Sequence, residues 1–148
     1  MAFVLDASVT AVWAFADESC NVADAAAESL KSGAALVPQI WWYEIRNLVL
    51  TGERRRRIAQ PDSIAFFHLL SAYPIRVEPV KDEQTIWRLA RDHRLTFYDA
   101  SYLELALHHH VPLATLDSRL KDAALAAGIP LLALSAFDES PPSAPVPL

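Results

Sequence analysis

Four acidic residues are candidates for one chemically active site: Asp6, Glu44, Asp99 and Asp117. Asp6 ends the first expected strand, Asp117 follows the fourth, and Asp99 opens a helix after residues 95–98. Ligands of an open parallel sheet bind outside the carboxyl ends of its strands. We therefore expect Asp6 and Asp117 at one edge of the sheet, and Asp99 at a helix start that could face the same edge.

Each of the three aspartates also has a simpler explanation. Aspartate is a favoured N-cap residue worth about 1 kcal/mol, and all three positions precede helices. Glu44 differs because it lies inside an expected helix, where capping cannot explain it. It borders an apolar stripe formed by Trp41, Ile45, Leu48 and Val49. A carboxylate at that border has two explanations. It is paired or bound to a metal, and Asn47, one turn further along the helix, orients it. Otherwise the side chain reaches out to water.

The chemistry of such a group follows from its oxygen ligands. Four carboxylates without Cys or His partners suit Mg²⁺ or Mn²⁺ rather than zinc. If they converge, their mutual repulsion itself favours a bound cation. A site of this kind supports in-line hydrolysis of a phosphodiester, in which one ion activates water and another offsets charge on the leaving oxygen.

The elements that must position these side chains alternate along the chain. Short apolar runs are expected as strands, and segments of helical period lie between them. This order predicts an α/β fold with a parallel sheet covered by helices. The expected strands are 3–5, 35–37, 75–77, 113–115 and 130–133, and the expected helices are 9–15, 23–32, 39–50, 61–71, 82–93, 100–109 and 118–127.

Length and composition limit the other possibilities. A chain of 148 residues with 53% hydrophobic residues fits one core-rich domain, expected over residues 1–134. Residues 135–148 form a proline-rich tail with almost no capacity for a core. The only cysteine, Cys20, suits a reducing cytoplasm, and neither a secretory signal nor a membrane span is expected. Three glycines are too few for a dinucleotide fingerprint or a phosphate loop.

Four segments of the sequence resemble the acidic motifs of the PIN domain, in family order and at family-like spacing. The similarity is greatest to VapC-type toxins of bacterial toxin–antitoxin pairs, and it extends from the first strand to about residue 134. The segments are Val4-Leu5-Asp6-Ala7-Ser8, Trp41-Trp42-Tyr43-Glu44-Ile45-Arg46-Asn47, Leu95-Thr96-Phe97-Tyr98-Asp99-Ala100-Ser101-Tyr102 and Leu113-Ala114-Thr115-Leu116-Asp117-Ser118-Arg119-Leu120.

The resemblance implies a single PIN-like domain with a central, mostly parallel sheet. It implies that the four acids form a metal-binding active site, supported by the polar residues Ser8, Asn47 and Thr115. It further implies a Mg²⁺-dependent ribonuclease that a cognate antitoxin inhibits, a homodimer, and contact with DNA only through the antitoxin.

Two other functions remain open. One is a PIN-like module that binds metal or a partner without turnover. The other is a Mg²⁺-dependent phosphatase of the haloacid dehalogenase type, although that family needs a second aspartate where this chain has Ser8.

Basic and aromatic residues add possible contacts. The run Arg54-Arg55-Arg56-Arg57 could contact RNA phosphates, or it could be a solvated helix face, because consecutive helical residues point in different directions. Trp13, Phe15, Trp41 and Trp42 belong either to a protein interface or to the core. His108, His109 and His110 are expected at the end of a helix rather than on a metal, because adjacent helical residues cannot chelate together.

Overall fold

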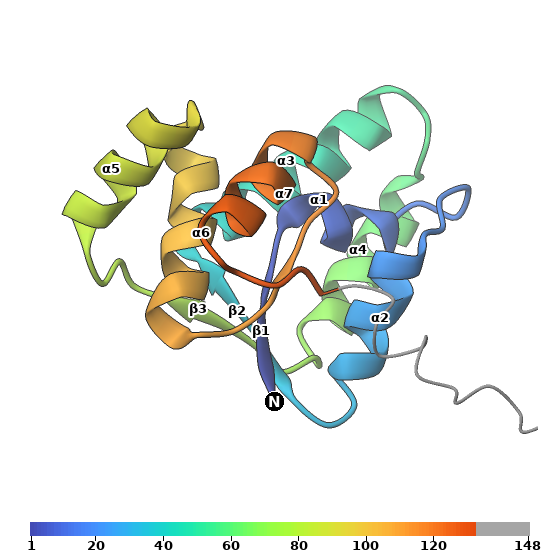
Figure 1. Ribbon diagram of the computed structural model, residues 1–148. Coiled ribbons are helices and arrows are strands. Elements are labelled where there is room, and N and C mark those ends of the chain that lie inside the picture. The colour runs from blue at the N-terminus through green and yellow to red at the C-terminus, as the bar shows by residue number, and fades with distance from the viewer. Residues whose placement is uncertain (133–148) are drawn as a thin grey trace, which may run out of the picture.

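The computed structural model describes residues 1–132 of the chain, and within them helices alternate with the strands of one sheet (Figure 1). The strands are β1 (Ala2–Leu5), β2 (Ala34–Pro38), β3 (Ile75–Glu78) and β4 (Leu113–Ala114). The helices are α1 (Ala7–Val12), α2 (Asn21–Ser29), α3 (Gln39–Arg54), α4 (Gln60–Leu70), α5 (Glu83–His93), α6 (Phe97–His109) and α7 (Ser118–Ala126). The predicted α/β fold class is confirmed.

The sheet is parallel and has the strand order β3-β2-β1-β4. The chain adds β2 and then β3 on one side of β1, and it crosses over to add β4 on the other side. The carboxyl ends of β1 and β4 therefore lie at the point where the direction of strand addition reverses, which is where parallel sheets bind their ligands. Val4 pairs with Leu113 and Leu5 with Ala114, so the residues that follow these strands start side by side.

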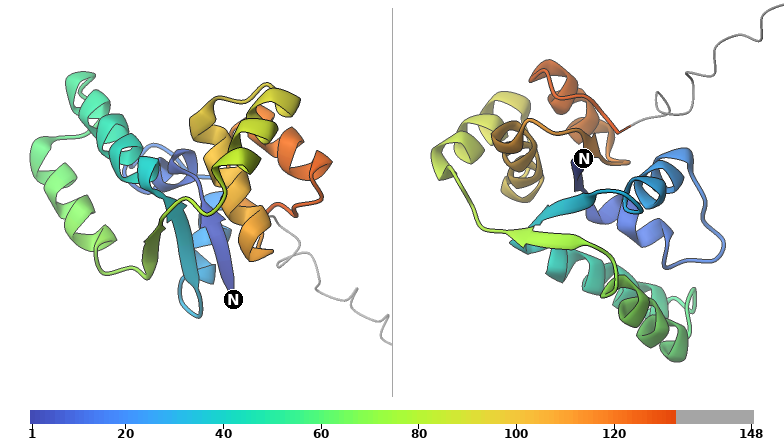
Figure 2. Two further views of the ribbon diagram at one scale, coloured as in Figure 1. Left: turned by 90° about the vertical axis from the view of Figure 1, so that its left-hand side faces the viewer. Right: turned by 90° about the horizontal axis from the view of Figure 1, so that it is seen from below.

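Helices cover both faces of the sheet (Figure 2). Helices α5, α6 and α7 lie on one face, and α1, α3 and α4 lie on the other. Strands β1 and β2 are almost fully buried between these layers, as continuous apolar runs in parallel sheets usually are. Helix α6 is buried along most of its length, from Ala100 to Ala106. The core therefore fixes the positions of the strand ends and of the helices that start beside them.

Several element boundaries differ from those predicted. Helix α6 begins three residues before the predicted start at Ala100, because Thr96 caps it. Helix α3 continues four residues beyond Leu50, to Arg54. Of the predicted fifth strand, the described residues contain one parallel bridge, between Leu113 and Leu131. The rest of that strand, the end of the predicted domain and the predicted proline-rich tail lie outside the described residues.

The four aromatic residues considered for an interface have different environments. Phe15 and Trp41 are buried in the core, and Trp13 is half-buried. Trp42 is the one of the four with a large exposed area, at 45%. The interface interpretation is therefore wrong for Phe15 and Trp41. Within residues 1–132, no helix has both the length and the apolar character needed to cross a membrane.

Candidate active site

Asp6 is held in place by the neighbouring strand. It occupies the N-cap position of α1, but its side chain makes no capping hydrogen bond. Instead, its Oδ2 accepts hydrogen bonds from the hydroxyls of Thr115 and Ser8, each at 2.7 Å. The side chain is 5% exposed. Burial raises the pKa of the Asp6 carboxyl, and the hydrogen bonds from Thr115 and Ser8 oppose that rise. Asp6 is therefore a buried, oriented carboxylate rather than a cap.

The two hydroxyls also connect Asp6 to the loop after β4. Thr115 Oγ1 accepts a hydrogen bond from the Asp117 backbone N–H at 3.1 Å. Ser8 Oγ accepts one from the Leu116 backbone N–H, also at 3.1 Å. Each hydroxyl thus donates to the carboxylate and accepts from the loop, which satisfies both groups in a largely buried place. Ser8 and Thr115 lie beside Asp6, where a supporting role would require them.

Glu44 receives its hydrogen bond from a residue that the sequence analysis did not single out. The Tyr102 hydroxyl on α6 donates to Glu44 Oε1 on α3 at 2.7 Å, and the Tyr102 side chain is fully buried. Burial raises the pKa of the Tyr102 phenol, so this group acts as a neutral donor. Its position three residues after Asp99, on the same side of one helix, was a signal available in the sequence.

Asn47 does not take that role. Its side chain is exposed, and the hydrogen bond recorded at the Glu44 carboxylate comes from Tyr102. The prediction that Asn47 orients Glu44 is therefore wrong. Leu48, predicted in the apolar stripe of α3, is also 39% exposed, whereas Trp41, Ile45 and Val49 are buried.

Asp99 and Asp117 both lie at the start of a helix. Asp99 is the third residue of α6, and its backbone N–H donates to Thr96 Oγ1 at 3.1 Å, so Thr96 rather than Asp99 caps that helix. Asp117 is exposed, and its Oδ1 accepts from the Leu120 backbone N–H at 2.9 Å. Capping is confirmed for Asp117 and wrong for Asp6 and Asp99.

The acids interact electrostatically. Burial raises the pKa of the Glu44 carboxyl, and the negative charges of Asp6 and Asp99 raise it further. Burial likewise raises the pKa of the Asp99 carboxyl, with additional contributions from Asp6 and Asp117. Repulsion therefore acts among Asp6, Glu44 and Asp99, and between Asp99 and Asp117. This repulsion, and a donor set made only of carboxylate oxygens, fit a hard divalent cation. In residues 1–132, however, no three acidic, His or Cys side chains already form a metal-chelating group.

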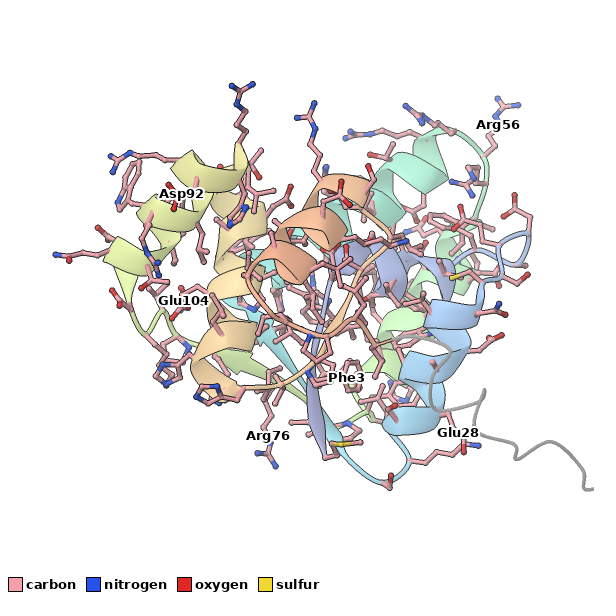
Figure 3. The ribbon with its side chains drawn as sticks, viewed as in Figure 1. Phe3, Glu28, Arg56, Arg76, Asp92 and Glu104 are labelled. Atoms are coloured by element: carbon pink, nitrogen blue, oxygen red, sulfur yellow. The ribbon has the colours of Figure 1, made fainter. Side chains whose placement is uncertain are left out.

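The arginine run lies at the far end of α3. Glu44 and Arg54 are ten residues apart on one helix, which places them about 15 Å apart along its axis. Arg57 forms ion pairs with Glu18 and Asp17, and its guanidinium lies over the Phe15 ring, 4.2 Å from the centroid. The exposed Arg56 projects outward beyond the end of α3 (Figure 3). Arg57 therefore tethers the chain that follows α1.

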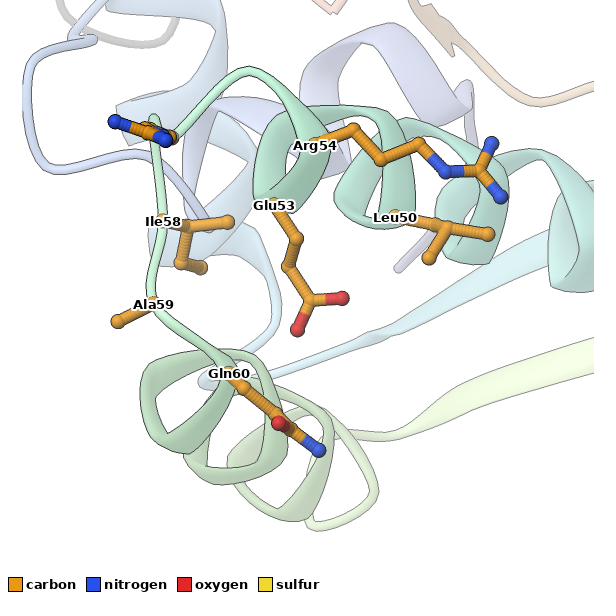
Figure 4. Close-up of a pocket in the computed structure, with 7 residues that line it drawn as sticks. Leu50, Glu53, Arg54, Ile58, Ala59 and Gln60 are labelled. Carbon is orange, nitrogen blue, oxygen red and sulfur yellow. The ribbon is translucent and has the colours of Figure 1, made fainter.

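A hollow of about 660 Å³ adjoins this run, between the end of α3 and the start of α4. Glu53 extends from α3 toward Gln60 of α4, and Arg54 and Arg56 line the same hollow (Figure 4). None of the four candidate acids lines it. The hollow is therefore separate from the carboxyl edge of the sheet.

The family model of the PIN domain matches residues 3–125. The chain belongs to the PIN domain family. That match covers all four acids, and in this fold Asp6 and Asp117 follow neighbouring parallel strands. A search of curated proteins found no match to the chain.

Solved structures share the fold of this PIN domain. PAE2754 from Pyrobaculum aerophilum is 21% identical with a TM-score of 0.65, covering 83% of this chain and 84% of its own. VapC20 of Mycobacterium tuberculosis, described as a sarcin-ricin loop cleaving toxin, is 18% identical with a TM-score of 0.59, over 82% of this chain and 94% of its own. FitAcB from Neisseria gonorrhoeae is 17% identical with a TM-score of 0.52, over 87% and 95%. At these identities, the likeness concerns the fold.

Proposed function

We propose that this PIN domain is an endoribonuclease toxin that uses Mg²⁺ or Mn²⁺ to hydrolyse RNA phosphodiester bonds. The observation that carries the proposal is the buried Asp6 carboxylate, oriented by Thr115 and Ser8 and electrostatically coupled to Glu44 and Asp99. A carboxylate buried without a cationic side chain is costly unless a cation compensates it. Its place at the switch point of a parallel sheet is where a ligand can reach it.

The residues of this chain would divide the work as follows. Asp6, Glu44, Asp99 and Asp117 would hold the cation, which when bound supplies activated water and offsets charge on the leaving oxygen. Thr115 and Ser8 fix the direction of the Asp6 carboxylate, and Tyr102 fixes that of Glu44. One carboxylate oxygen of Asp117 already accepts a hydrogen bond from the α7 backbone, so Asp117 would contribute least of the four to binding the cation.

The partners of the proposed toxin follow from its family and its neighbours in fold. VapC20 is named a toxin that cleaves the sarcin-ricin loop, which supports RNA as the class of substrate here. We propose a cognate antitoxin that blocks the acidic edge, contact with DNA only through that antitoxin, a homodimer, and a cytoplasmic location. Arg54, Arg55 and Arg56 remain candidates for an RNA contact remote from the acids, while Arg57 is already paired.

The first experiment is cleavage of total RNA by the purified full chain with Mg²⁺ or Mn²⁺. Parallel samples contain EDTA, or a folded Asp6→Asn variant in place of the wild type. We expect cleavage by the wild type alone, and loss of cleavage in both controls. Cleavage that persists in EDTA, or in folded Asp6→Asn, would contradict a carboxylate–metal mechanism.

The alternative function is a module that binds metal or a partner without turnover. Mg²⁺ calorimetry separates the two when wild-type protein cleaves no RNA. Heat of binding that disappears in Asp6→Asn would indicate a loaded but non-catalytic site. The haloacid dehalogenase alternative loses support, since Ser8 serves as a hydrogen-bond partner of Asp6.

A further inference from the structure

A second basic feature lies next to the acids and is independent of the arginine run on α3. A cleft of about 440 Å³ separates the end of α5 from α7. Its lining contains His93 and Arg94 from the end of α5, and Arg119 and Asp122 from α7. Two of these side chains are arginines and one is an aspartate, so with His counted as neutral the lining carries a formal charge of +1 in a chain whose formal net charge is −5. The cleft is therefore weakly positive in a chain that is acidic as a whole.

Both walls of this cleft continue directly into the acidic edge. Arg94 lies two residues before Thr96, whose side chain caps the helix that carries Asp99. Arg119 lies two residues after Asp117, in the first turn of α7. Asp99 and Asp117 are themselves close enough for the charge of one to raise the pKa of the other. Each arginine of the cleft therefore lies within five residues of an acid of the edge, Arg94 of Asp99 and Arg119 of Asp117.

The two arginines of the cleft are available for a ligand. Neither forms an ion pair or a side-chain hydrogen bond with another of residues 1–132, and both are exposed. Arg57 of the α3 run, by contrast, is engaged by Glu18 and Asp17. Arg94 also stands in the left-handed region, with φ 53°, where a side chain costs about 1–2 kcal/mol relative to glycine.

We propose that Arg94 and Arg119 grip the phosphate backbone of single-stranded RNA next to the bond that the acids cleave. The proposal rests on the proposed ribonuclease function for the position of the scissile bond. Carboxylates repel a phosphodiester, so a substrate needs positive contacts close to the acids. Two guanidinium groups facing one cleft provide paired donors suited to phosphate oxygens. Asp122 lines the same cleft, so two guanidinium groups face one carboxylate there.

The test measures binding of a short fluorescein-labelled single-stranded RNA to the full chain in EDTA, where no cleavage is expected. Anisotropy titrations from about 50 to about 200 mM KCl give the slope of log K against log salt. We expect Arg94→Gln and Arg119→Gln each to reduce the slope by about 0.7, and the double variant by about 1.4, the value for single-strand phosphate contacts. Each loss should also weaken binding by about tenfold.

Matched variants keep the result specific. Arg76→Gln removes the same charge at the opposite edge of the molecule (Figure 3) and should leave the slope unchanged. Arg94→Lys and Arg119→Lys keep the charge and should keep most of the slope. A slope unaffected by both cleft variants overturns the proposal. So does an absence of measurable RNA binding by wild type, or a slope that falls with Arg54→Gln alone.

Cleavage with Mg²⁺, measured separately on the same variants, distinguishes this proposal from the proposed function. Salt-dependent binding that requires Arg94 and Arg119, without any cleavage, supports the cleft and contradicts the ribonuclease. If RNA is cleaved but both cleft variants keep the salt slope of the wild type, the ribonuclease is supported and the role of the cleft is contradicted. Circular dichroism of each variant checks the fold, which substitution of exposed side chains should preserve.

Discussion

The ends of β1 and β4 carry the same local pattern and have different properties. In each, a parallel strand leads to an aspartate at the N-cap position of a helix. After β1, Asp6 is buried and accepts hydrogen bonds from two hydroxyls instead of from its helix. After β4, Asp117 is exposed and caps α7. The difference arises because β1 is flanked on both sides by strands, whereas β4 is the more peripheral strand. The burial of Asp6 and its bond from the distant Thr115, together with the local hydroxyl of Ser8, separate the two roles.

The largest expected effect is the loss of cleavage in Asp6→Asn compared with Asp117→Asn. Asp6→Asn should reduce kcat by about 10³-fold, because a cation site worth several kcal/mol to the transition state loses its most buried ligand. Asp117→Asn should reduce it by about tenfold or less, since asparagine also caps helices and the side chain is exposed. Steady-state cleavage of one RNA substrate measures both. Equal reductions of kcat in the two variants would contradict the different roles assigned to Asp6 and Asp117.

Tyr102→Phe should have the next largest effect. Removing the hydroxyl leaves Glu44 without its orienting hydrogen bond, and loss of such a supporting group typically costs about 10–100-fold in activity or metal affinity. Added Mg²⁺ should recover part of the rate. Tyr98→Phe is the control, because the Tyr98 side chain is exposed and its hydroxyl makes no hydrogen bond with another of residues 1–132. If Tyr102→Phe keeps the wild-type kcat at every Mg²⁺ concentration, Tyr102 does not position Glu44.

Asp99→Asn should raise the thermal midpoint in EDTA at neutral pH. The pKa of Asp99 is raised above 3.8 by folding, so its carboxyl favours the folded state below that pH and loses this contribution as pH rises through the folded pKa. The asparagine does not titrate, so the difference between variant and wild type should grow from about pH 4 toward pH 7. We expect at most about 4 °C, because solvent screens a half-buried group.

Added Mg²⁺ tests the origin of that difference. A cation that neutralises the acids should stabilise the wild type more than Asp99→Asn, and so reduce the gap between their midpoints. A gap that is constant across pH and unaffected by Mg²⁺ would indicate a packing effect of the substitution instead.

The smallest expected effect is the change in the free energy of unfolding when the Asp117 cap of α7 is removed. Asp117→Ala should lower the free energy of unfolding by about 1 kcal/mol, whereas Asp117→Asn should lower it by a few tenths. Urea denaturation of the two variants in EDTA measures the difference. Equal destabilisation would mean that the negative charge of Asp117, rather than its hydrogen bond to the Leu120 backbone, stabilises α7.

Much of the fold followed from patterns along the chain. The apolar runs predicted all four strands within one or two residues, because strands buried on both faces must be continuously apolar. The start of α6 was misplaced because Thr96 competes with Asp99 as a cap, and both residue types favour that position. The end of α3 was predicted too early because apolar residues do not recur at helical spacing in the arginine run. Gly52 and Ile58 nevertheless pack there around Phe15.

The sequence by itself determined the α/β fold class and the four acids, because strand period and residue type are local properties. The tertiary structure decided what each acid does. It brought Thr115 to Asp6 across 109 residues and Tyr102 to Glu44 across 58 residues, contacts that depend on strand order and on helices that cover opposite faces of one sheet. It also paired Arg57 with Glu18, while Arg94 and Arg119 came to line one cleft. Such contacts depend on long-range packing, which no local pattern encodes.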